Sequence, residues 1–365
     1  MDSYEAHGSP LGVDELKLVK QAFGFDPEVN FHVPADVLNY YQEKGSKGAA
    51  DEKAWNELYS KYKAQYPELA AEYELMASGN LPEGWKDKLP VFSATDKAIA
   101  TRSASGKVIN AIAPEIPQLI GGSADLAPST NTLIDNCDSF TANNYGGRNF
   151  HFGIREHAMG SILNGMALSH NIIPYGATFL IFSEYMRPPI RLAAIMKIRP
   201  IFIYTHDSIG LGEDGTTHQP VEQLISLRSI PNITVLRPAD ANETAHAWRV
   251  ALEHKTGPVC LVLTRQALPI LDQQKYGTAQ NVEKGAYILS DCEGDAQIIL
   301  LATGSEVSLI MKAQAALAAE DIRSRVVSMP SWELFEKQDE TYKNTVLPKH
   351  IKKRVSVEAG STLGW

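Results

Sequence analysis

Short apolar runs alternate with helix-like stretches through the middle of the chain, from about residue 95 to residue 267. The apolar runs are rich in β-branched and aromatic residues, which is typical of strands, and the stretches between them have the spacing of helices. The candidate strands are 119–120, 201–205, 233–236 and 258–263, and the candidate helices include 98–112 and 161–169. This alternation predicts an α/β domain with a mostly parallel sheet, which we bound at residues 89–272.

A second alternation of the same kind follows. Its candidate elements are a strand at 298–302, a helix at 307–319 and strands at 325–329 and 354–357. We therefore predict a further α/β domain over residues 273–365, whose polar first stretch, 273–286, is expected to be a linker. Because the sequence stops with a sheet edge and a sheet face uncovered, we expect this domain to be partial.

Residues 1–88 are polar and favour helices that lie on a surface, with candidates at 13–23 and 51–75. His7 stands out because neighbouring glycine and proline residues exclude a regular helix and hold its ring on a loop. A single loop histidine is usually only solvated, so the residues alone give it no role.

Composition and charge narrow the class of protein. The 365 residues, 44% hydrophobic and 21% charged, suffice for roughly two or three globular domains. A formal net charge of −9 and a pI near 5.6 argue against nucleic acid or a membrane surface as the main partner. Three widely spaced cysteines, Cys137, Cys260 and Cys292, fit a reducing compartment rather than a disulfide framework or a closed zinc site. No signal-peptide pattern is seen, and no apolar run approaches the ~20 residues of a membrane span.

The stretch 201–220 is the strongest candidate for chemistry. An apolar run leads into a glycine-punctuated loop, and Pro220 can then open a helix. The loop carries two imidazoles and two carboxylates, those of His206, Asp207, Asp214 and His218. Ligands of α/β proteins bind at the carboxyl ends of parallel strands. Each residue alone could be a solvated surface group, but their density favours a loop that contacts a small polyhydroxylated molecule.

Two further features precede this loop. Glu156 opens an apolar helix candidate, so its carboxyl is either ionised and stabilised by the N-terminal amides or desolvated enough to keep a proton near neutrality. The alternative is an ordinary first-turn glutamate. Phe179, Phe182 and Tyr185 follow at three-residue spacing, which is normally core packing but could present a ring face to a flat heterocycle.

Three positions could approach a ligand from other elements. Arg265 follows a candidate strand and could grip a phosphate near the loop, or it could be a surface arginine. Arg102 lies on the first turns of the helix candidate 98–112. Gly121 and Gly122 follow a short apolar run, where they could turn backbone amides toward a ligand, although such pairs are common in ordinary turns.

Five strings resemble the transketolase family, namely 121–129, 152–156, 179–182, 205–220 and 328–330. The resemblance extends from His7 to Trp365, and the string 205–220 is its most specific part. It implies thiamine-diphosphate-dependent transfer of a two-carbon ketol unit from a ketose phosphate to an aldose phosphate. The setting it implies is the pentose phosphate pathway, or the Calvin cycle in photosynthetic cells, with a homodimer in the cytoplasm or the chloroplast stroma.

The resemblance also implies roles on the cofactor side. Glu156 would hydrogen-bond the aminopyrimidine of thiamine diphosphate, and Phe182, with Phe179 and Tyr185 nearby, would form the wall on which that ring stacks. His7 would lie near the thiazolium. On this basis the expected catalytic residues are Glu156, His7 and His218.

On the substrate side, the resemblance assigns contacts to the sugar phosphate. The residues expected to bind it are Arg102, Ser129, His206 and Arg265 at the phosphate end, Asp214 at a hydroxyl and His218 around the reacting carbonyl. Neutral-range imidazoles suit proton transfer to and from sugar oxygens.

The sequence departs from the family at the diphosphate end. The family binds the diphosphate and a divalent ion such as Mg²⁺ through a Gly-Asp-Gly motif and a later asparagine, and this sequence contains no Gly-Asp-Gly. We therefore expect no metal ligands, and we expect residues 1–88 to be the tail of a diphosphate-binding domain and a linker. The chain resembles a transketolase cut at both ends and is a candidate for inactivity on its own. Pro188-Pro189 falls where the family continues a helix, so we expect a kink or an early stop there.

Two alternatives stay open. The first is another thiamine-diphosphate enzyme, such as a deoxyxylulose phosphate synthase or a phosphoketolase, against which the loop 206–220 argues. The second is a non-catalytic chain that only binds or associates, which the missing diphosphate motif favours.

Overall fold

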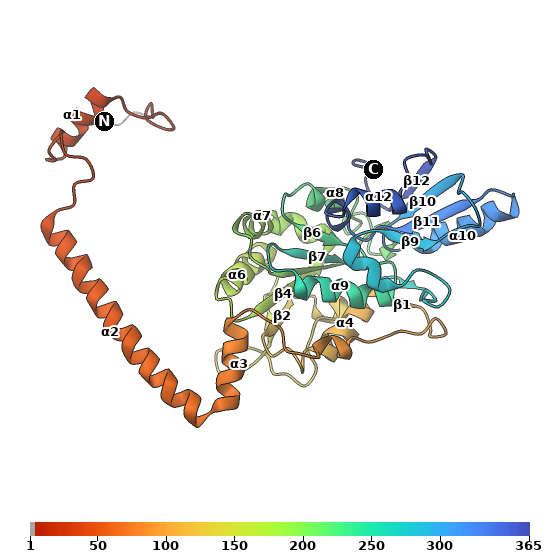
Figure 1. Cartoon of the computed structure of the whole chain (residues 1–365), viewed down its shortest axis with the longest axis horizontal. Coiled ribbons are helices and arrows are strands. Elements are labelled where there is room, and N and C mark those ends of the chain that lie inside the picture. Colours follow the sequence, from red (N-terminus) through yellow and green to blue (C-terminus); the bar gives the residue numbers. More distant parts are fainter. Residues whose placement is uncertain (1–3) are drawn as a thin grey trace. The chain divides into compact units, whose positions relative to one another are not determined.

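The computed structural model describes residues 4–365, which divide into a first unit up to Glu72 and a second unit from Tyr73 to Trp365. The first unit contains α1 (Val13–Ala22), α2 (Ala35–Gln65) and the first residues of α3 (Pro67–Ala77) (Figure 1). The single helix expected at 51–75 is therefore wrong, because two helices cover this stretch. Pro67 explains the break, since a proline disfavours the helical conformation of the residue before it, and Tyr66 has φ −131° and ψ 66°.

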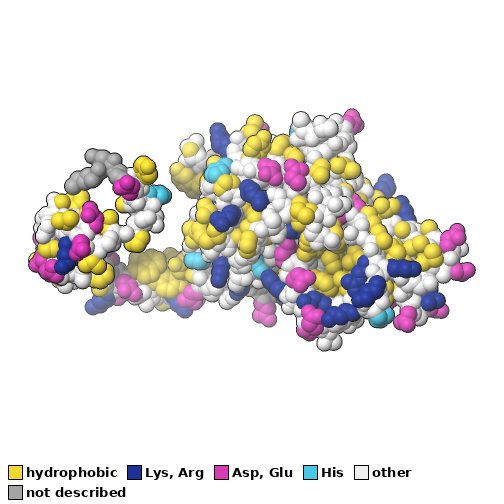
Figure 2. All heavy atoms as spheres, turned by 90° about the horizontal axis from the view of Figure 1, so that it is seen from above, with side chains coloured by type: hydrophobic (Ala, Val, Ile, Leu, Met, Phe, Trp, Pro, Cys, Tyr) yellow, Lys and Arg dark blue, Asp and Glu magenta, His cyan; other side chains and the backbone are white. Residues whose placement is uncertain are grey.

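Aromatic side chains line one side of α2. Trp55, Tyr59 and Tyr62 are three or four residues apart and share a helix face, with ring centroids 6.1 and 6.4 Å apart along the row. Trp55 is 53% exposed, and Figure 2 shows hydrophobic side chains on the surface of this unit. The helix buries none of its side chains, so it depends on contacts along its own surface and on the Tyr59 hydroxyl, which donates to the Ala70 carbonyl oxygen of α3 over 3.4 Å.

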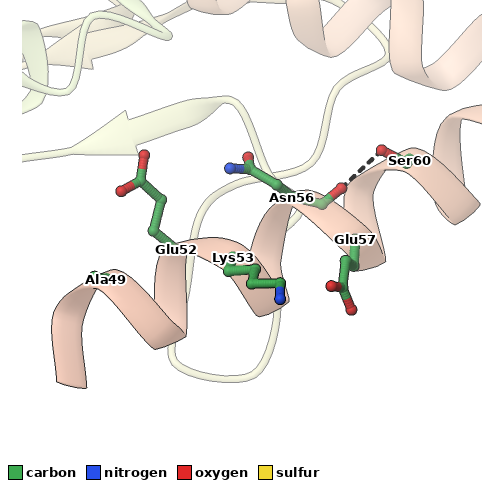
Figure 3. A pocket seen from close by; sticks show the side chains of 6 residues that line it. All are labelled: Ala49, Glu52, Lys53, Asn56, Glu57 and Ser60. Atoms are coloured by element: carbon green, nitrogen blue, oxygen red, sulfur yellow. Dashed lines mark hydrogen bonds between the residues drawn. The ribbon is translucent and has the colours of Figure 1, made fainter. Parts of the chain in front are cut away.

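A shallow hollow on the same helix is lined by exposed side chains of α2 alone, those of Ala49, Glu52, Lys53, Asn56, Glu57 and Ser60. Figure 3 shows Glu52 and Glu57 pointing in different directions. The interaction drawn there is the Ser60 hydroxyl, which donates to the Asn56 carbonyl oxygen over 2.8 Å. Because these groups diverge and are solvated, the hollow does not resemble a ligand site.

The second unit contains a six-stranded parallel sheet in the order β3-β2-β4-β5-β7-β6. Its strands are β2 (Leu119–Ser123), β3 (Asn149–His151), β4 (Ile173–Phe179), β5 (Ile201–Thr205), β6 (Thr234–Leu236) and β7 (Val259–Val262). The sheet confirms the α/β domain predicted from the apolar runs. Neither β3 nor β4 was among the predicted strands, and β3 is short and follows a long polar stretch.

Helices cover both faces of this sheet (Figure 1). They are α4 (Thr101–Ile112) and α9 (Ala241–Glu253) on one face, and α6 (Glu156–Leu168), α7 (Arg187–Met196) and α8 (Gln223–Arg228) on the other. Alternate residues of β5 point to opposite faces, so Ile201 and Ile203 join the core under α4 and α9, while Phe202 and Tyr204 join the other core. All four are buried, as expected for a central parallel strand with a continuous apolar run.

Pro188 and Pro189 neither kink nor stop a helix, so that expectation is wrong. The segment before them, η2 (Leu180–Met186), is a 3₁₀ helix, and α7 begins at Arg187, which places both prolines in the first turn of α7. Prolines are tolerated there because first-turn amides have no partner within the helix.

Gly121 and Gly122 lie inside β2, between β3 and β4, and not in a turn that faces a ligand. A side chain at Gly121 would clash with Tyr175, and one at Gly122 with the backbone of Phe150. The pair therefore permits close approach of neighbouring backbone and side chains, which corrects the proposed ligand-facing role.

We expect Gly122→Ala to destabilise the chain by about 1–3 kcal/mol, because the added methyl group overpacks a central strand. Gly165→Ala is the matched control. Gly165 lies exposed in α6 with open space around it, so this change is expected to stabilise the chain by about 0.5–1 kcal/mol. Urea unfolding followed by circular dichroism compares the two, and a Gly122→Ala protein as stable as the parent would contradict this packing.

A four-stranded mixed sheet follows in the order β12-β10-β11-β9. Its elements are β9 (Tyr287–Ser290), β10 (Ile298–Ala302), α10 (Glu306–Ala319), β11 (Ser324–Ser328), α11 (Trp332–Glu336), α12 (Glu340–Val346) and β12 (Arg354–Val357). The predicted second α/β domain is confirmed. β9 runs antiparallel to β11 and was not predicted, whereas the other pairs are parallel.

The stretch 273–286 is not a free linker, contrary to expectation. It contains η4 (Ala279–Lys284), which packs against α9, and Val282 is fully buried. Directly after it, the Tyr287 hydroxyl donates to Glu243 of α9 over 2.7 Å, and the Ser328 hydroxyl donates to the same carboxyl over 2.6 Å. Buried polar contacts therefore join α9 to the C-terminal sheet, and burial raises the pKa of Glu243 to about 7.

Short elements complete the second unit. They are η1 (Trp85–Lys88), β1 (Ile99–Ala100), which pairs antiparallel with β8 (Ala267–Leu268), α5 (Ala127–Thr130) and η3 (Ile209–Leu211). The helix expected from residue 98 therefore begins only after β1. None of the helices that residues 4–365 form is long and apolar enough to cross a membrane.

Candidate active site at the carboxyl edge of the six-stranded sheet

Glu156 is the first residue of α6, and its side chain is buried rather than directed to solvent. Only 7% of the residue is exposed. The Thr178 hydroxyl donates to Oε1 of Glu156 over 3.1 Å. Thr178 is the penultimate residue of β4, so the carboxyl lies at the edge of the sheet where the parallel strands end.

An aromatic wall continues from β4 into η2. The Phe179 and Phe182 rings are stacked with centroids 5.7 Å apart, and the Phe182 and Tyr185 centroids are 6.0 Å apart. A 3₁₀ helix has three residues per turn, so Phe182 and Tyr185 share one side of η2. Phe179 is 7% exposed and Tyr185 is 65% exposed, so the wall runs from the core to the surface and leaves a ring accessible.

Two imidazoles contact this wall. The His206 ring stacks on Phe179 with centroids 3.7 Å apart, and the His218 ring meets Phe182 edge-on at 5.4 Å. His206 Nε2 lies 3.9 Å from Oδ2 of Asp214. The glycine-punctuated loop therefore folds back so that both of its histidines and one of its carboxylates lie beside the aromatic side chains.

His206 is held in an unusual state. Its φ of 57° lies in the left-handed region, which few non-glycine residues adopt. Burial, followed by the positive charge of Arg102, lowers the pKa of His206 to about 4, while Asp214 acts in the opposite direction. The ring is therefore neutral near pH 7, with one nitrogen able to donate a hydrogen bond and one able to accept.

This low pKa predicts a pH dependence. Unfolded histidine titrates near 6.5, so as pH falls from about 6.5 to about 4 the unfolded chain gains the proton first and the folded chain loses stability. The pKa values of His246 and His254 are lowered too, so comparison with His206→Asn isolates the contribution of His206. NMR of the imidazole nitrogens should show His206 neutral at about pH 5, and titration near 6.5 would contradict this environment.

Two guanidiniums approach the loop. Nη1 of Arg102, on the first turn of α4, donates to the Ser129 carbonyl oxygen over 2.5 Å, and its buried Nε has no partner among the described residues. Nη1 of Arg265, after β7, donates to the Leu211 carbonyl oxygen over 2.8 Å. The pKa of Arg102 is lowered by burial and then by the charge of Arg265, with Asp214 opposing. Guanidiniums placed so close together favour an anion between them.

The candidate residues of the second unit are thus gathered at one edge of the sheet. His7 is the exception, since it lies in the first unit as an exposed residue whose backbone amide donates to the Tyr4 carbonyl oxygen over 2.9 Å. Its assignment stays a prediction.

Two residues that the sequence did not suggest join the site. They are Thr178, which bonds Glu156, and Arg237, which bonds Asp207 beside His206. Arg237 directly follows β6, so the rule that pointed to Arg265 after β7 could also have pointed to Arg237. Thr178 gave no signal, because a threonine near the end of a strand is common.

Residues 4–365 contain no group of three or more His, Cys, Asp or Glu side chains arranged to hold a metal ion. What the edge does provide is a buried carboxyl, an aromatic wall, the neutral His206 ring beside Asp214, the His218 ring and two guanidiniums. These groups suit a flat nitrogen heterocycle on one side and a phosphorylated polyol on the other.

Three family models match successive parts of the chain. Residues 1–82 match the transketolase thiamine diphosphate binding domain, residues 97–270 the transketolase pyrimidine binding domain, and residues 285–365 the transketolase-like C-terminal domain. The exact domain boundaries at 88 and 272 stay predictions.

Curated relatives of similar sequence are transketolases too. Transketolases of Halalkalibacterium halodurans and Aquifex aeolicus are 51% and 50% identical over 360 and 364 residues. The alignments cover 99% and 100% of this chain but 54% and 52% of the relatives. The chain therefore spans about half the length of the curated relatives it matches.

Solved structures of transketolases are also similar to this chain. The transketolase of Pichia stipitis in complex with sedoheptulose-7-phosphate has a TM-score of 0.92 and 45% identity, and the match covers 98% of this chain and 53% of that one. A split gene transketolase, described as an inactive β4 tetramer, has a TM-score of 0.59 and 28% identity over 73% of this chain and 82% of that one. Together with the folds of both sheets, these similarities establish that the chain belongs to the transketolase family.

Proposed function

We propose that this chain supplies the pyrimidine side and the sugar-phosphate side of a ketol-transferase active site, for transfer of a two-carbon unit from a ketose phosphate to an aldose phosphate. The observation that carries the proposal is the position of Glu156. Its buried carboxyl accepts a hydrogen bond from Thr178, the residue before Phe179, at the same sheet edge as His206, Asp214 and both guanidiniums.

The residues present fit the pyrimidine half of thiamine diphosphate. Glu156 would hydrogen-bond the ring, and Phe182 with the exposed face of Tyr185 would stack on it. When bound, the cofactor supplies the electron sink that carries the two-carbon unit between donor and acceptor. The role of Glu156 is to hold a proton at the ring nitrogen nearest its carboxyl. The aromatic wall excludes water from one face.

At the substrate end, Arg102 and Arg265 would bind the phosphate, with Ser129 beside Arg102. Asp214 would accept a hydrogen bond from a sugar hydroxyl, and neutral His206 would donate one at the phosphate end. His218, against the aromatic wall, would move protons at the sugar carbonyl. The ligands of the Pichia stipitis structures, xylulose-5-phosphate and sedoheptulose-7-phosphate, support a sugar phosphate as the substrate.

The diphosphate end is not provided by these residues. The sequence has no Gly-Asp-Gly, and the described residues offer no metal cluster. We propose that the ligands of the diphosphate and of Mg²⁺ belong to the half of the full-length family protein that this chain does not span. We also propose that His7 joins the site only in the complete assembly. A homodimer, in the cytoplasm or the chloroplast stroma, is the form proposed for that assembly.

Identity near 50% over the whole chain to proteins named transketolase favours this activity over other thiamine-diphosphate enzymes. A chain that only associates is favoured by the split gene relative, which is described as inactive. We therefore propose that activity requires the remaining half, whether fused or added as a second polypeptide.

The test is a donor and acceptor assay on the reconstituted enzyme, meaning this chain combined with the family's remaining half. Transfer from xylulose-5-phosphate to an aldose phosphate is expected, with far less from an unphosphorylated ketose. Calorimetry on the chain alone, with thiamine diphosphate and Mg²⁺, is expected to show no tight metal-dependent binding. Absence of transfer from any ketose phosphate by a folded, cofactor-loaded enzyme would overturn the proposal.

A further inference from the structure

Arg237 lies fully buried beneath the substrate loop, at the end of β6. Its Nε and Nη2 both bond Oδ2 of Asp207, over 2.9 and 2.7 Å, and both side chains are 0% exposed. Asp207 directly follows His206. The sequence resemblance gives Arg237 no role, and neither residue belongs to the set proposed to contact cofactor or substrate.

From Asp207, the contacts continue into the loop. The Ser208 hydroxyl donates to Oδ1 of Asp207 over 3.3 Å and accepts a hydrogen bond from the Gly210 amide over 3.2 Å, which caps η3. The last residue of η3, Leu211, accepts the hydrogen bond of Arg265. One carboxylate thus ties the left-handed conformation of His206 to the position of Arg265.

On its other side, Arg237 is held by the C-terminal sheet. Nη1 donates to the Thr303 carbonyl oxygen over 3.0 Å and to the Thr303 hydroxyl over 2.9 Å, and it also pairs with Glu306. The Thr303 hydroxyl in turn donates to Glu358 over 2.6 Å. Thr303 to Glu306 is the turn between β10 and α10, so this arginine connects the C-terminal domain directly to the loop.

A buried ion pair could serve stability alone. Such pairs contribute little net stability compared with apolar residues of the same shape, but they define one geometry, because breaking them leaves a charge without a partner. Here the defined geometry is a loop that contains His206 and supports Arg265, both from the proposed substrate site. A pair that served stability alone would not need to fix the conformation of this loop.

We propose that Arg237 is a positioning residue through which the C-terminal domain holds the loop 206–211 in the shape that receives the sugar phosphate. The effect of Arg237 on the reaction rests on the proposed function, whereas its effect on the order of the loop does not. The C-terminal domain, which places no side chain of its own among the candidate site residues, acts on the site through this arginine.

The first experiment measures amide hydrogen exchange of Gly210 and Leu211 in the 365-residue chain without ligand. Thr303→Val and Glu306→Gln weaken the grip of the C-terminal domain but leave the Arg237–Asp207 pair in place. We expect both to speed exchange at these amides by at least ~10-fold. Arg237→Lys keeps the charge but loses the contact of two guanidinium nitrogens with Asp207, so it is also expected to speed exchange at these amides.

Asp291→Asn is the matched control. Asp291 pairs with Arg325 in the same domain over 2.8 and 3.1 Å, but this pair lies on strand and surface residues away from the loop. Exchange at Gly210 and Leu211 should be unchanged in this variant. Thermal unfolding identifies any variant that fails to fold. In that case the exchange rates of Gly210 and Leu211 in Thr303→Val, which keeps all charges, test the proposal.

The second experiment uses the reconstituted enzyme. Glu306→Gln is expected to raise KM for the ketose phosphate by about 10-fold and to change kcat less, without altering thiamine diphosphate affinity. Exchange rates in Thr303→Val and Glu306→Gln equal to those of the parent would overturn the proposal. Faster exchange in an enzyme that transfers no ketol unit would instead refute the proposed function and leave the positioning role standing.

Discussion

Glu156→Gln is expected to lower ketol transfer by the reconstituted enzyme by about 100-fold or more, and Glu156→Ala to nearly abolish it, with the fold intact. The reason is that an amide keeps the shape of the carboxyl but cannot hold the proton at the cofactor ring. Loss of a positioned acid or base typically costs about 10²–10⁴ in rate. Initial rates at saturating cofactor measure the effect.

Glu184→Gln is the control, because Glu184 is an exposed residue of η2 and lies outside the proposed site. It should leave turnover within about twofold of the parent, as surface substitutions usually do. Circular dichroism and thermal unfolding confirm that Glu156→Gln is folded. A folded Glu156→Ala enzyme with near-normal turnover would remove Glu156 from the mechanism.

The second large effect is expected from Arg265→Gln, which should reduce kcat/KM for a ketose phosphate by roughly 10- to 100-fold. A hydrogen bond to a charged group is worth about 1.5–3 kcal/mol, and each ~1.4 kcal/mol is tenfold. Arg102→Gln should act in the same direction, since its guanidinium approaches the loop with that of Arg265. Steady-state kinetics with ketoses that do and do not carry a phosphate provide the measurement.

The unphosphorylated ketose separates phosphate binding from loop support, because Arg265 also bonds Leu211. If Arg265 binds the phosphate, the variant loses its preference for the phosphorylated donor and changes little toward the other. Arg191→Gln, at an exposed position of α7, is the charge-matched control. Equal losses with both ketoses would assign Arg265 to loop support alone.

The sequence predicts the main architecture because hydrophobic periodicity reflects burial directly. The apolar run at β5 predicts a central strand, and its residues fill the cores on both faces. The polar side chains after β5 and β7 lie at one edge, as the rule for parallel sheets requires. Asp240, directly before α9, caps it by accepting a hydrogen bond from the Glu243 amide over 2.8 Å.

What the sequence could not show depends on tertiary contacts. Gly121 and Gly122 have the composition of a turn, but Tyr175 and Phe150 crowd them inside β2. Pro188-Pro189 suggests a break, yet an α-helix begins there. Arg237 looks like any charged residue after a strand, and only the fold of a segment some seventy residues later brings Thr303 and Glu306 to it.

The roles of the site residues are predicted from the family resemblance, and not from periodicity or packing. The structure brings Glu156 to Thr178 and the histidines to the aromatic wall. His7 belongs to a separate unit, so neither periodicity nor packing within the second unit bears on it.

The most direct measurement is a crystal structure of the reconstituted enzyme with thiamine diphosphate bound. We expect a pyrimidine nitrogen about 2.6–3.2 Å from a carboxyl oxygen of Glu156, with the ring stacked on Phe182. A pyrimidine bound away from Glu156 and from the aromatic wall, in a folded enzyme that turns over, would contradict it.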